Sequence, residues 1–540
     1  MSDLRAVNAR LRRVVADKDE LIAARDALLV VQREQLADQG ALIEGQARQL
    51  SSQDEMVRLQ GEQLATQAEL IRRLQQEMAE LRRQLVANSG NSSTPPSKDS
   101  IAAKATQRAD RSSRVRSKDR KPGGQPGRTG TGLTPTPDPD RSERVEPPAQ
   151  CRECHADLGA AAELGDGWAQ VWDILPTVLE KAHYQLPRRR CGCGTVTTAA
   201  PPFGQAGTVC YGPNLNAAAI VLGSEGNVPV QRSAMLIHTL LGVQVSAGFV
   251  ARAAERLADK LHAAGFDEAM NAALRGEDVL CGDESPVNVL RNDLDDSGEQ
   301  VAGAPHAVTL RTPDARLIYY AAMTSRSKTS IADLGVLPDW HGYLVRDDYA
   351  GWHQFDPHLA GVQQCCAHVI RHCKGVLELH PNWQKWAGEV ITVLRDTAAA
   401  VEQAKIAGAE QLDPELLANL QARYDKAVDW GITTNRHRDW HKGNHPGYNL
   451  ATRLKVKAEQ VWLFARNFTI PWTNNASEQA LKSPKRHQAV SGYWHSTDTL
   501  RGYLRVRSYL ASARGHGIRA IDAIHTALTG NPWLPIPATT

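Results

Sequence analysis

Apolar residues recur at every seventh position between residues 15 and 85, and this stretch contains no proline. The members of the repeat are Val15, Ile22, Leu29, Leu36, Ile43, Leu50, Val57, Leu64, Ile71, Met78 and Leu85. Because a strict seven-residue repeat forms one stripe on a helix, it predicts a long helix that self-associates as a coiled coil over residues 1–87. A single long helix that packs on its own protein is the alternative.

The second seam of this helix is partly polar. Three positions after the first seam lie Gln39, Gln46, Gln53, Gln60 and Gln67, and only Leu74 and Leu81 restore apolar residues. Polar seam residues weaken association but can fix the register and the number of strands.

Residues 88–148 are dominated by Ser, Pro, Gly, Arg and Lys, so they can bury little apolar surface and are predicted to form a disordered linker. Between residues 104 and 128 the linker carries nine basic and two acidic residues. Such a run can bind a phosphate backbone by releasing counterions. Arg120, Lys121 and Arg128 are therefore candidate DNA contacts, and a solvated tether is the alternative.

Two closely spaced cysteine pairs follow in residues 149–205. They are Cys151 with Cys154, and Cys191 with Cys193. Two such pairs can supply the four thiolates of a tetrahedral zinc site, so this segment is predicted to be a small zinc-binding module. Free buried cysteines are the alternative. Directly before the second pair come three candidate phosphate-binding residues, Arg188, Arg189 and Arg190.

Residues 206–276 have a helical pattern. Helices over 230–241 and 247–261 flank a break at residues 242–246, where Ser246 is a plausible helix cap. Two helices around a tight glycine turn favour a helix-turn-helix that binds DNA, although an ordinary helical hairpin has the same pattern.

From residue 277 the pattern changes to short apolar strands. Strands are predicted over 279–290, 307–311 and 317–323, then a helix over 328–334, a strand ending at residue 346, a helix, and a strand over 362–366 leading into a helix. This order matches an RNase H-like fold, in which the first and fourth strands lie side by side. Residues 383–465 are predicted to be a helical insertion, and residues 466–540 to complete the domain.

Three acids stand out against this pattern. Asp283 interrupts a buried strand, Asp347 follows the end of another, and Glu478 lies about one turn into a predicted helix. A carboxylate in a core strand is costly unless it is paired or binds a metal. Together the three predict a metal-binding carboxylate set suited to phosphoryl transfer. Three unrelated acids are the alternative.

The net charge of the chain gives little evidence for nucleic-acid binding, because 63 Lys and Arg nearly balance 60 Asp and Glu. Nucleic-acid binding must therefore come from local clusters. One follows Glu478, where basic residues alternate with aromatic ones, as suits a DNA strand held by its phosphates and stacked bases. Its members are Lys482, Lys485, Arg486, His487, Tyr493, Trp494, Arg501, Arg505 and Arg507.

The chain has no apolar run near ~20 residues and no secretory signal, so neither a membrane span nor export is expected. Its nine cysteines are an odd number, and four of them are paired as in metal sites. That usage fits a reducing cytosol better than a disulfide scaffold.

Several motifs, which occur in one order along nearly the whole chain, resemble the DDE transposases of the insertion sequence sixty-six family, TnpC type. They are residues 88–97 (NSGNSSTPPS), 120–127 (RKPGGQPG), the two cysteine pairs, 283–287 (DESPV), 347–352 (DDYAGW), 365–368 (CCAH) and 474–478 (NNASE).

The resemblance implies a bacterial, nucleoid-associated transposase of multidomain α/β architecture. Its parts would be an N-terminal coiled coil, a small zinc-binding module, an HTH-like helical domain and an RNase H-like catalytic domain with a helical insertion. It also implies cut-and-join chemistry on the double-stranded DNA of transposon ends and target, and two small accessory proteins of the same element.

Carried over to this chain, the resemblance makes Asp283, Asp347 and Glu478 the catalytic acids, which would hold two Mg²⁺ or Mn²⁺ ions ~4 Å apart. Asp348 stands where the family usually has glycine. Because neighbouring residues on a strand point to opposite faces, only one of Asp347 and Asp348 is expected to reach the metal. His368 is expected to touch DNA or to orient an acid.

Further alternatives remain open at this point. Cys365, His368 and His372 share one helical face and could form a second zinc set, although DNA contact is preferred for His368. Glu284 is interpreted as structural, and Asn474 and Asn475 are expected to cap the Glu478 helix and to help position it. As whole-protein alternatives, the chain could be a non-catalytic DNA-bridging protein or an RNase H-like repair nuclease.

Overall fold

The computed structural model describes residues 2–86, 88–92, 99–100, 104, 134–162, 164, 168–173, 179–290, 304–440 and 442–537. The candidate DNA contacts Arg120, Lys121 and Arg128 lie outside these residues. The chain forms two compact units: Met1–Val86 with His437–His445, and Ala87–Arg436 with Pro446–Thr540.

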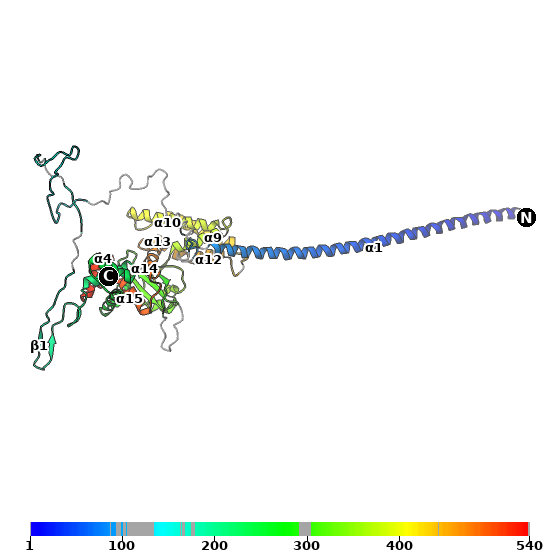
Figure 1. The fold of residues 1–540 in the computed structure, drawn as a ribbon. Coiled ribbons are helices and arrows are strands. Elements are labelled where there is room, and N and C mark those ends of the chain that lie inside the picture. Colours follow the sequence, from blue (N-terminus) through cyan, green and yellow to red (C-terminus); the bar gives the residue numbers. More distant parts are fainter. Residues whose placement is uncertain are drawn as a thin grey trace. The chain divides into compact units, whose positions relative to one another are not determined.

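The predicted N-terminal helix is confirmed as a single element, α1 (Ser2–Val86), which runs without a break (Figure 1). The seven-residue stripe lies open along it, with Leu36 and Ile43 each about two thirds exposed. An apolar stripe of this length is a surface for association. Whether it forms a coiled coil stays a prediction.

A five-stranded mixed sheet organises the second unit. Its strands are β3 (Val279–Pro286), β4 (His306–Arg311), β5 (Ile318–Met323), β6 (Tyr343–Arg346) and β7 (Gly361–Gln364), in the order β5-β4-β3-β6-β7. β3, β4 and β5 pair antiparallel, whereas β6 is parallel to both β3 and β7. The expected neighbourhood of the first and fourth strands is therefore confirmed. The helix predicted between β6 and β7 is wrong, because two 3₁₀ turns, η4 (Trp352–Gln354) and η5 (Asp356–His358), replace it.

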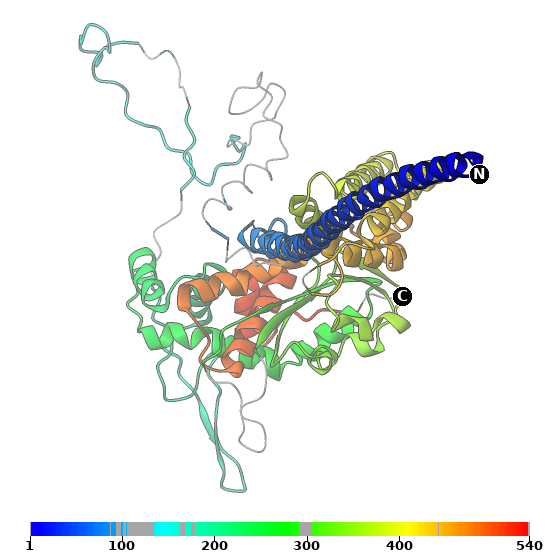
Figure 2. The same cartoon turned by 90° about the vertical axis from the view of Figure 1, so that its right-hand side faces the viewer.

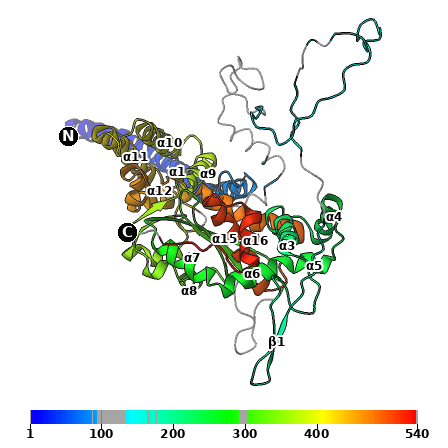
Figure 3. The same ribbon diagram turned by 90° about the vertical axis from the view of Figure 1, so that its left-hand side faces the viewer.

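Helices cover the sheet and extend beyond it, as Figures 2 and 3 show from opposite sides. They are α3 (Pro213–Ile220), α4 (Val230–Leu241), α5 (Ala247–Ala251), α6 (Ala253–Ala263), α7 (Phe266–Arg275), α8 (Lys328–Ala332), α9 (Cys366–Leu379), α10 (Lys385–Ile406), α11 (Pro414–Asn435), α12 (Pro446–Val456), α13 (Ala458–Arg466), α14 (Asn475–Ser491), α15 (Thr497–Gly515) and α16 (Ala520–Leu528). The remaining elements are a π-helical turn η2 (Val221–Glu225), a 3₁₀ turn η3 (Leu337–Asp339) and a hairpin of β1 (Arg188–Arg190) with β2 (Val196–Thr198). None of the helices within the described residues is both long and apolar enough to cross a bilayer.

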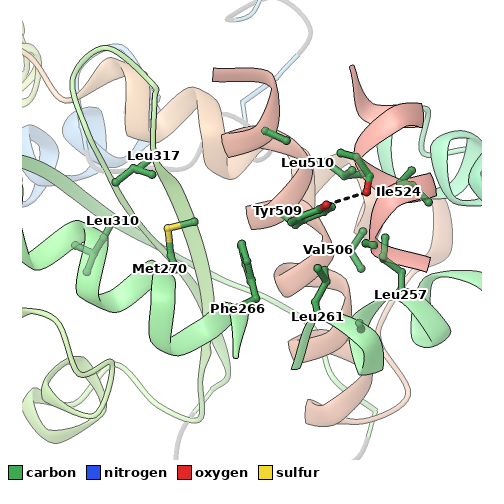
Figure 4. Packing of buried hydrophobic residues seen from close by; sticks show 14 of the residues in the cluster. Leu257, Leu261, Phe266, Met270, Leu310, Leu317, Val506, Tyr509, Leu510 and Ile524 are labelled. Atoms are coloured by element: carbon green, nitrogen blue, oxygen red, sulfur yellow. Dashed lines mark hydrogen bonds between the residues drawn. The ribbon is translucent and has the colours of Figure 1, made fainter. Parts of the chain in front are cut away.

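The buried apolar residues of the described part form three clusters, and alternation along β3 and β6 assigns their side chains to two of them. Leu280 and Leu344 belong to a cluster with α3, α4, α6, α7, α15 and α16, part of which Figure 4 shows. There the Tyr509 hydroxyl donates a hydrogen bond to the Ala523 carbonyl at 2.8 Å. Cys281 and Val345 belong to the other cluster, with α9 to α13. The helices predicted over residues 383–465 are thus present.

The helical pair predicted before the sheet is partly corrected. α4 ends where Gly242 takes a left-handed conformation, and Ser246 caps α5 by accepting a hydrogen bond from the Phe249 amide at 3.1 Å. The predicted second helix is divided at Arg252 into α5 and α6. DNA binding by this pair stays a prediction.

The free edge of the sheet is closed by side chains of α15. The Ser508 hydroxyl accepts a hydrogen bond from the Tyr320 amide at 2.7 Å, and Ser512 accepts one from the Ile318 amide at 2.9 Å. The same hydroxyls lie 3.2 Å from the carbonyls of those two strand residues. An unpaired edge is a site for aggregation, and here a helix covers it with hydroxyls that serve as donors and acceptors.

We expect Ser508→Ala to lower the free energy of unfolding by about 1–3 kcal/mol, because it leaves the buried Tyr320 amide without its acceptor. Urea unfolding of the full chain measures this loss, with Ser491→Ala, an exposed helix-end serine, as the matched control. An equal loss in both variants would contradict the role assigned to Ser508.

Candidate active site

The register of β3 and β6 brings two of the predicted acids to the same level. The parallel pairing aligns Leu280 with Leu344 and Cys281 with Val345. Two residues beyond that last pair come Asp283 on β3 and Asp347 just past β6. Because side chains repeat their direction every second residue, both acids are on the face of Cys281 and Val345. The end of β6 therefore faces a carboxylate on its neighbour.

Glu478 reaches this region from the first turn of α14. The Asn474 side-chain amide donates to the Gly282 carbonyl at 2.7 Å, next to Asp283, and the Asn474 backbone amide donates to Cys365 Sγ at 3.1 Å. These bonds attach the start of α14 to both β3 and the start of α9. The expectation for Asn474 holds in part: it occupies the N-cap position of α14, but its side chain makes no cap hydrogen bond and positions the helix through its bond to β3 instead.

The three acids act on one another electrostatically. The pKa of Asp283 is raised well above its usual range, first by burial and then by the negative charges of Glu284, Asp347 and Glu478. Arg371 of α9 balances Glu478 in part, since one of its nitrogens lies 4.0 Å from a carboxylate oxygen. His368 Nδ1 lies 3.7 Å from the other oxygen, but burial and the Arg371 charge lower the pKa of this ring, which favours its neutral form. The site therefore concentrates negative charge that its protein neighbours only partly compensate.

The neighbouring acid Glu284 faces the other side of the sheet. It accepts hydrogen bonds from the Trp352 indole at 2.8 Å and from Arg326 Nε at 2.7 Å. Burial raises its pKa, and Asp347 adds to that shift, whereas Arg326 opposes it. The interpretation of Glu284 as structural agrees with these contacts.

Asp348 binds the helical insertion. Its carboxylate accepts hydrogen bonds from Lys457 Nζ at 2.6 Å and Gln364 at 2.7 Å, and an Arg453 nitrogen lies 3.4 Å away. Burial raises its pKa, but the Lys457 hydrogen bond and the Arg453 charge outweigh burial, so the pKa is lowered overall. The extra acid therefore joins the end of β6 to α12 and to Lys457, between α12 and α13, while Asp347 faces the other acids.

Arg346, one residue before Asp347, has a role that the sequence did not reveal. Its guanidinium is fully buried, bonds both carboxylate oxygens of Asp356 at 2.6 and 2.8 Å, and donates to the Asp347 carbonyl at 2.7 Å. A bidentate pair of this kind fixes geometry as well as charge. An arginine at the end of an apolar strand was the available signal, but its partner ten residues away could not be identified from spacing.

Several predicted DNA contacts are occupied within the protein. Lys485 donates to the Pro286 carbonyl, and Arg505 forms a bidentate pair with Asp267. Arg507 bonds Glu225 at 2.6 Å, and Trp494 is only 3% exposed. The burial of Trp494 and Arg507 argues against the expectation that they bind DNA, whereas Arg505 is partly accessible and its DNA contact stays a prediction. Lys482, Arg486 and the arginines of β1 (Arg188, Arg189, Arg190) remain at least partly accessible.

The four cysteines of the predicted zinc module form two separate turns. The Cys151 amide donates to the Ala156 carbonyl, and the Cys191 amide donates to the Thr195 carbonyl in the β1–β2 hairpin. Hydrogen bonds from Thr195 lower the pKa of Cys193 to about 7, which favours its thiolate form. The structure does not bring the two pairs together into one group, although it describes all four residues.

Among the described His, Cys, Asp and Glu residues, one group has ligand atoms within 4.8 Å of one another: Cys365, His368 and Glu478. The alternative set with His372 is not assembled, because the ring of His372 bonds Arg453 at 2.9 Å. Asp283, Asp347 and Glu478 do not form such a group, so their ligand atoms do not all lie within 4.8 Å of one another.

The donor chemistry of Asp283, Asp347 and Glu478 fits a hard divalent cation, because carboxylate oxygens are what Mg²⁺ and Mn²⁺ prefer. Glu478 Oε1 is buried and makes no hydrogen bond within the described part of the chain. Burial and then the neighbouring carboxylates raise the pKa of Asp283, and a bound cation would oppose both by stabilising the charged form.

Comparison with known proteins gives a family match. A family model described as Transposase IS66 family matches residues 208–501, and a family of unknown function, DUF6444, matches residues 42–134. No curated protein matches the chain. Among solved structures, the Drosophila P element transposase strand transfer complex matches with 14% identity and a TM-score of 0.27, covering 56% of this chain and 92% of that chain. At this TM-score the likeness supports no detailed comparison.

We expect Asp348→Asn to lower the free energy of unfolding by about 1–3 kcal/mol, because it leaves Lys457 and Arg453 without their shared counter-charge. Thermal unfolding of the full chain checks this. Asp339→Asn, an exposed acid ahead of the same strand, is the matched control and should change little. An Asp348→Asn protein as stable as the control would show that the contacts of Asp348 contribute nothing.

Proposed function

Because the chain belongs to the Transposase IS66 family, we propose that Asp283, Asp347 and Glu478 form a DDE catalytic triad on an RNase H-like domain. The triad would hydrolyse a phosphodiester at the end of a DNA element. The freed 3′-hydroxyl would then attack target DNA at the same site.

The observation that carries this proposal is the position of the three acids relative to the sheet. The β3–β6 register supports a shared face for Asp283 and Asp347, and the Asn474–Gly282 hydrogen bond holds the Glu478 helix beside them. In this proposal, acids from two strands and one helix, far apart in sequence, would act together at the ends of β3 and β6. A structural role alone gives no reason for concentrating charges that destabilise one another.

Two Mg²⁺ or Mn²⁺ ions would be held by these carboxylates and would supply an activated attacking oxygen and a stabilised leaving oxygen. The residues themselves have separate tasks. Asp283 would present its carboxylate from β3 and Asp347 from the residue after β6, whose carbonyl accepts a hydrogen bond from Arg346. Arg371 and His368 lie beside Glu478, and in this proposal Arg371 would orient its carboxylate and both would meet a DNA phosphate.

Contacts with DNA outside the triad are part of the proposal. Lys482 and Arg486 follow Glu478 on α14, and Arg188, Arg189 and Arg190 line the β1–β2 hairpin. Arg120, Lys121 and Arg128 would add charge from the linker. Such contacts supply sequence-independent affinity that falls as salt rises. The helices α4 to α6 are the candidate sequence-reading element.

The remaining parts have supporting roles in this proposal. Cys151, Cys154, Cys191 and Cys193 would bind structural Zn²⁺, which would require the two turns to come together. The exposed stripe of α1 would pair chains as a coiled coil, so that two element ends could be held at once. Two small accessory proteins of the same element are candidate partners.

We expect Asp283→Ala to reduce strand transfer by about 100-fold or more, because it removes one member of the carboxylate set that would hold the ions. The measurement uses purified full-length protein, labelled element-end DNA and Mg²⁺ or Mn²⁺. Asp339→Asn is the matched control, and a gel shift checks that both variants still bind DNA.

Joined products that persist at the wild-type level in Asp283→Ala would refute the triad. Cleavage by the wild type without joining would favour the repair nuclease. Binding without any chemistry under either metal would favour the non-catalytic bridging protein.

A further inference from the structure

We propose that Cys365, His368 and Glu478 form a binding site for Zn²⁺, or another transition-metal ion of similar chemistry, and that occupation of this site withdraws Glu478 from DNA chemistry. The binding half stands on the geometry alone. The inhibitory half rests on the proposed function, since it assumes that Glu478 is a catalytic acid.

The three ligands converge from two helix starts. Cys365 is the residue before α9, His368 lies in the first turn of α9, and Glu478 lies in the first turn of α14. One ligand atom from each residue lies within 4.8 Å of the other two, and His368 Nδ1 is 3.7 Å from Glu478 Oε1. Small side-chain adjustments bring such atoms to the metal–ligand distances of 2.0–2.3 Å that are typical of zinc.

Two of these ligand atoms are buried without a hydrogen-bond partner. His368 Nδ1 and Glu478 Oε1 both have this property among the described residues. Their separation of 3.7 Å is too long for them to satisfy each other. A buried polar atom that makes no hydrogen bond is costly, and one metal ion between the two would satisfy both at once.

The ligand types select the metal. A thiolate, an imidazole and a carboxylate are ligands of zinc and of borderline transition metals, whereas Mg²⁺ disfavours sulfur. Three protein ligands leave a fourth position for water or a phosphate oxygen. The Asn474 amide, which donates to Cys365 Sγ at 3.1 Å, supports the sulfur as an acceptor. Binding would release the thiol proton of Cys365 to solvent.

The site is separate from the other cysteines. Cys366 Sγ lies 3.7 Å from the Val461 carbonyl, and Cys373 is buried further along α9 with the insertion. The ring of His372 is bonded by Arg453. None of these three belongs to the group, which makes Cys373 a matched control for Cys365.

Zinc at this site would oppose catalysis through geometry. If zinc draws the Glu478 carboxylate toward Cys365 and His368, that carboxylate cannot also bind Mg²⁺ together with Asp283 and Asp347. Glu478 is thus shared between a soft site on α9 and a hard oxygen site on the sheet. If zinc occupies the soft site, micromolar Zn²⁺ should inhibit the strand transfer that millimolar Mg²⁺ supports.

The first test measures Zn²⁺ bound per chain by equilibrium dialysis of the full-length protein. Wild type should bind one more ion than Cys365→Ser and His368→Gln, because each variant loses one of three ligands. Cys373→Ser should match the wild type, and the cysteine pairs of residues 151–193 contribute equally to all four proteins. Thermal unfolding confirms that each protein is folded. Equal stoichiometry in the four proteins overturns the site.

The second test titrates Zn²⁺ into Mg²⁺-supported strand transfer, with each protein compared to its own zinc-free rate. We expect the inhibiting concentration to rise at least about 10-fold in Cys365→Ser and to stay unchanged in Cys373→Ser. An unchanged value in Cys365→Ser overturns the inhibitory half. If the wild type transfers no strands, the proposed function fails, and dialysis alone decides the zinc site.

Discussion

The parallel pairing of β3 with β6 is the constraint on which the rest of the site depends. It sets Asp283 and Asp347 at one level on one face, and a slip of one residue would turn either acid to the opposite side. The burial of Leu280 and Leu344 in one core, and of Cys281 and Val345 in the other, makes such a slip costly on both faces. Packing of ordinary apolar side chains therefore specifies the position of the acids.

Holding these charges together requires attachments on every side. Asn474 bonds the α14 start to β3, Arg346 pairs with Asp356 behind Asp347, and Asp348 binds Lys457 and Arg453 of the insertion. The helical insertion is thereby more than a spacer between α9 and α14. It supplies cations that neutralise one of the two adjacent aspartates, which leaves the other to face Asp283.

Local patterns in the sequence predicted much of this arrangement. The heptads of α1, the strand order and the positions of the three acids follow from periodicity and family motifs. The predictions that failed concern residues whose roles depend on tertiary partners. Nothing in the segment after Glu478 distinguishes Trp494 and Arg507, which are buried, from Arg486, which is exposed. Likewise, Asn474 looks like a helix cap until its distant partner, the Gly282 carbonyl, is known. Helical spacing suggested His372 as the third member of the group with Cys365 and His368. The third member is Glu478, which comes from a different helix and cannot be identified from spacing.

The bond between Asn474 and Gly282 spans 192 residues of sequence, with the whole insertion between them. During translation the ribosome therefore synthesises β3, β6 and α9 well before α14. Until then the nascent chain carries two acids but lacks the third. A copy of the chain that is truncated before α14 would therefore contain Asp283 and Asp347 but neither Glu478 nor the Asn474 bond that attaches its helix to β3.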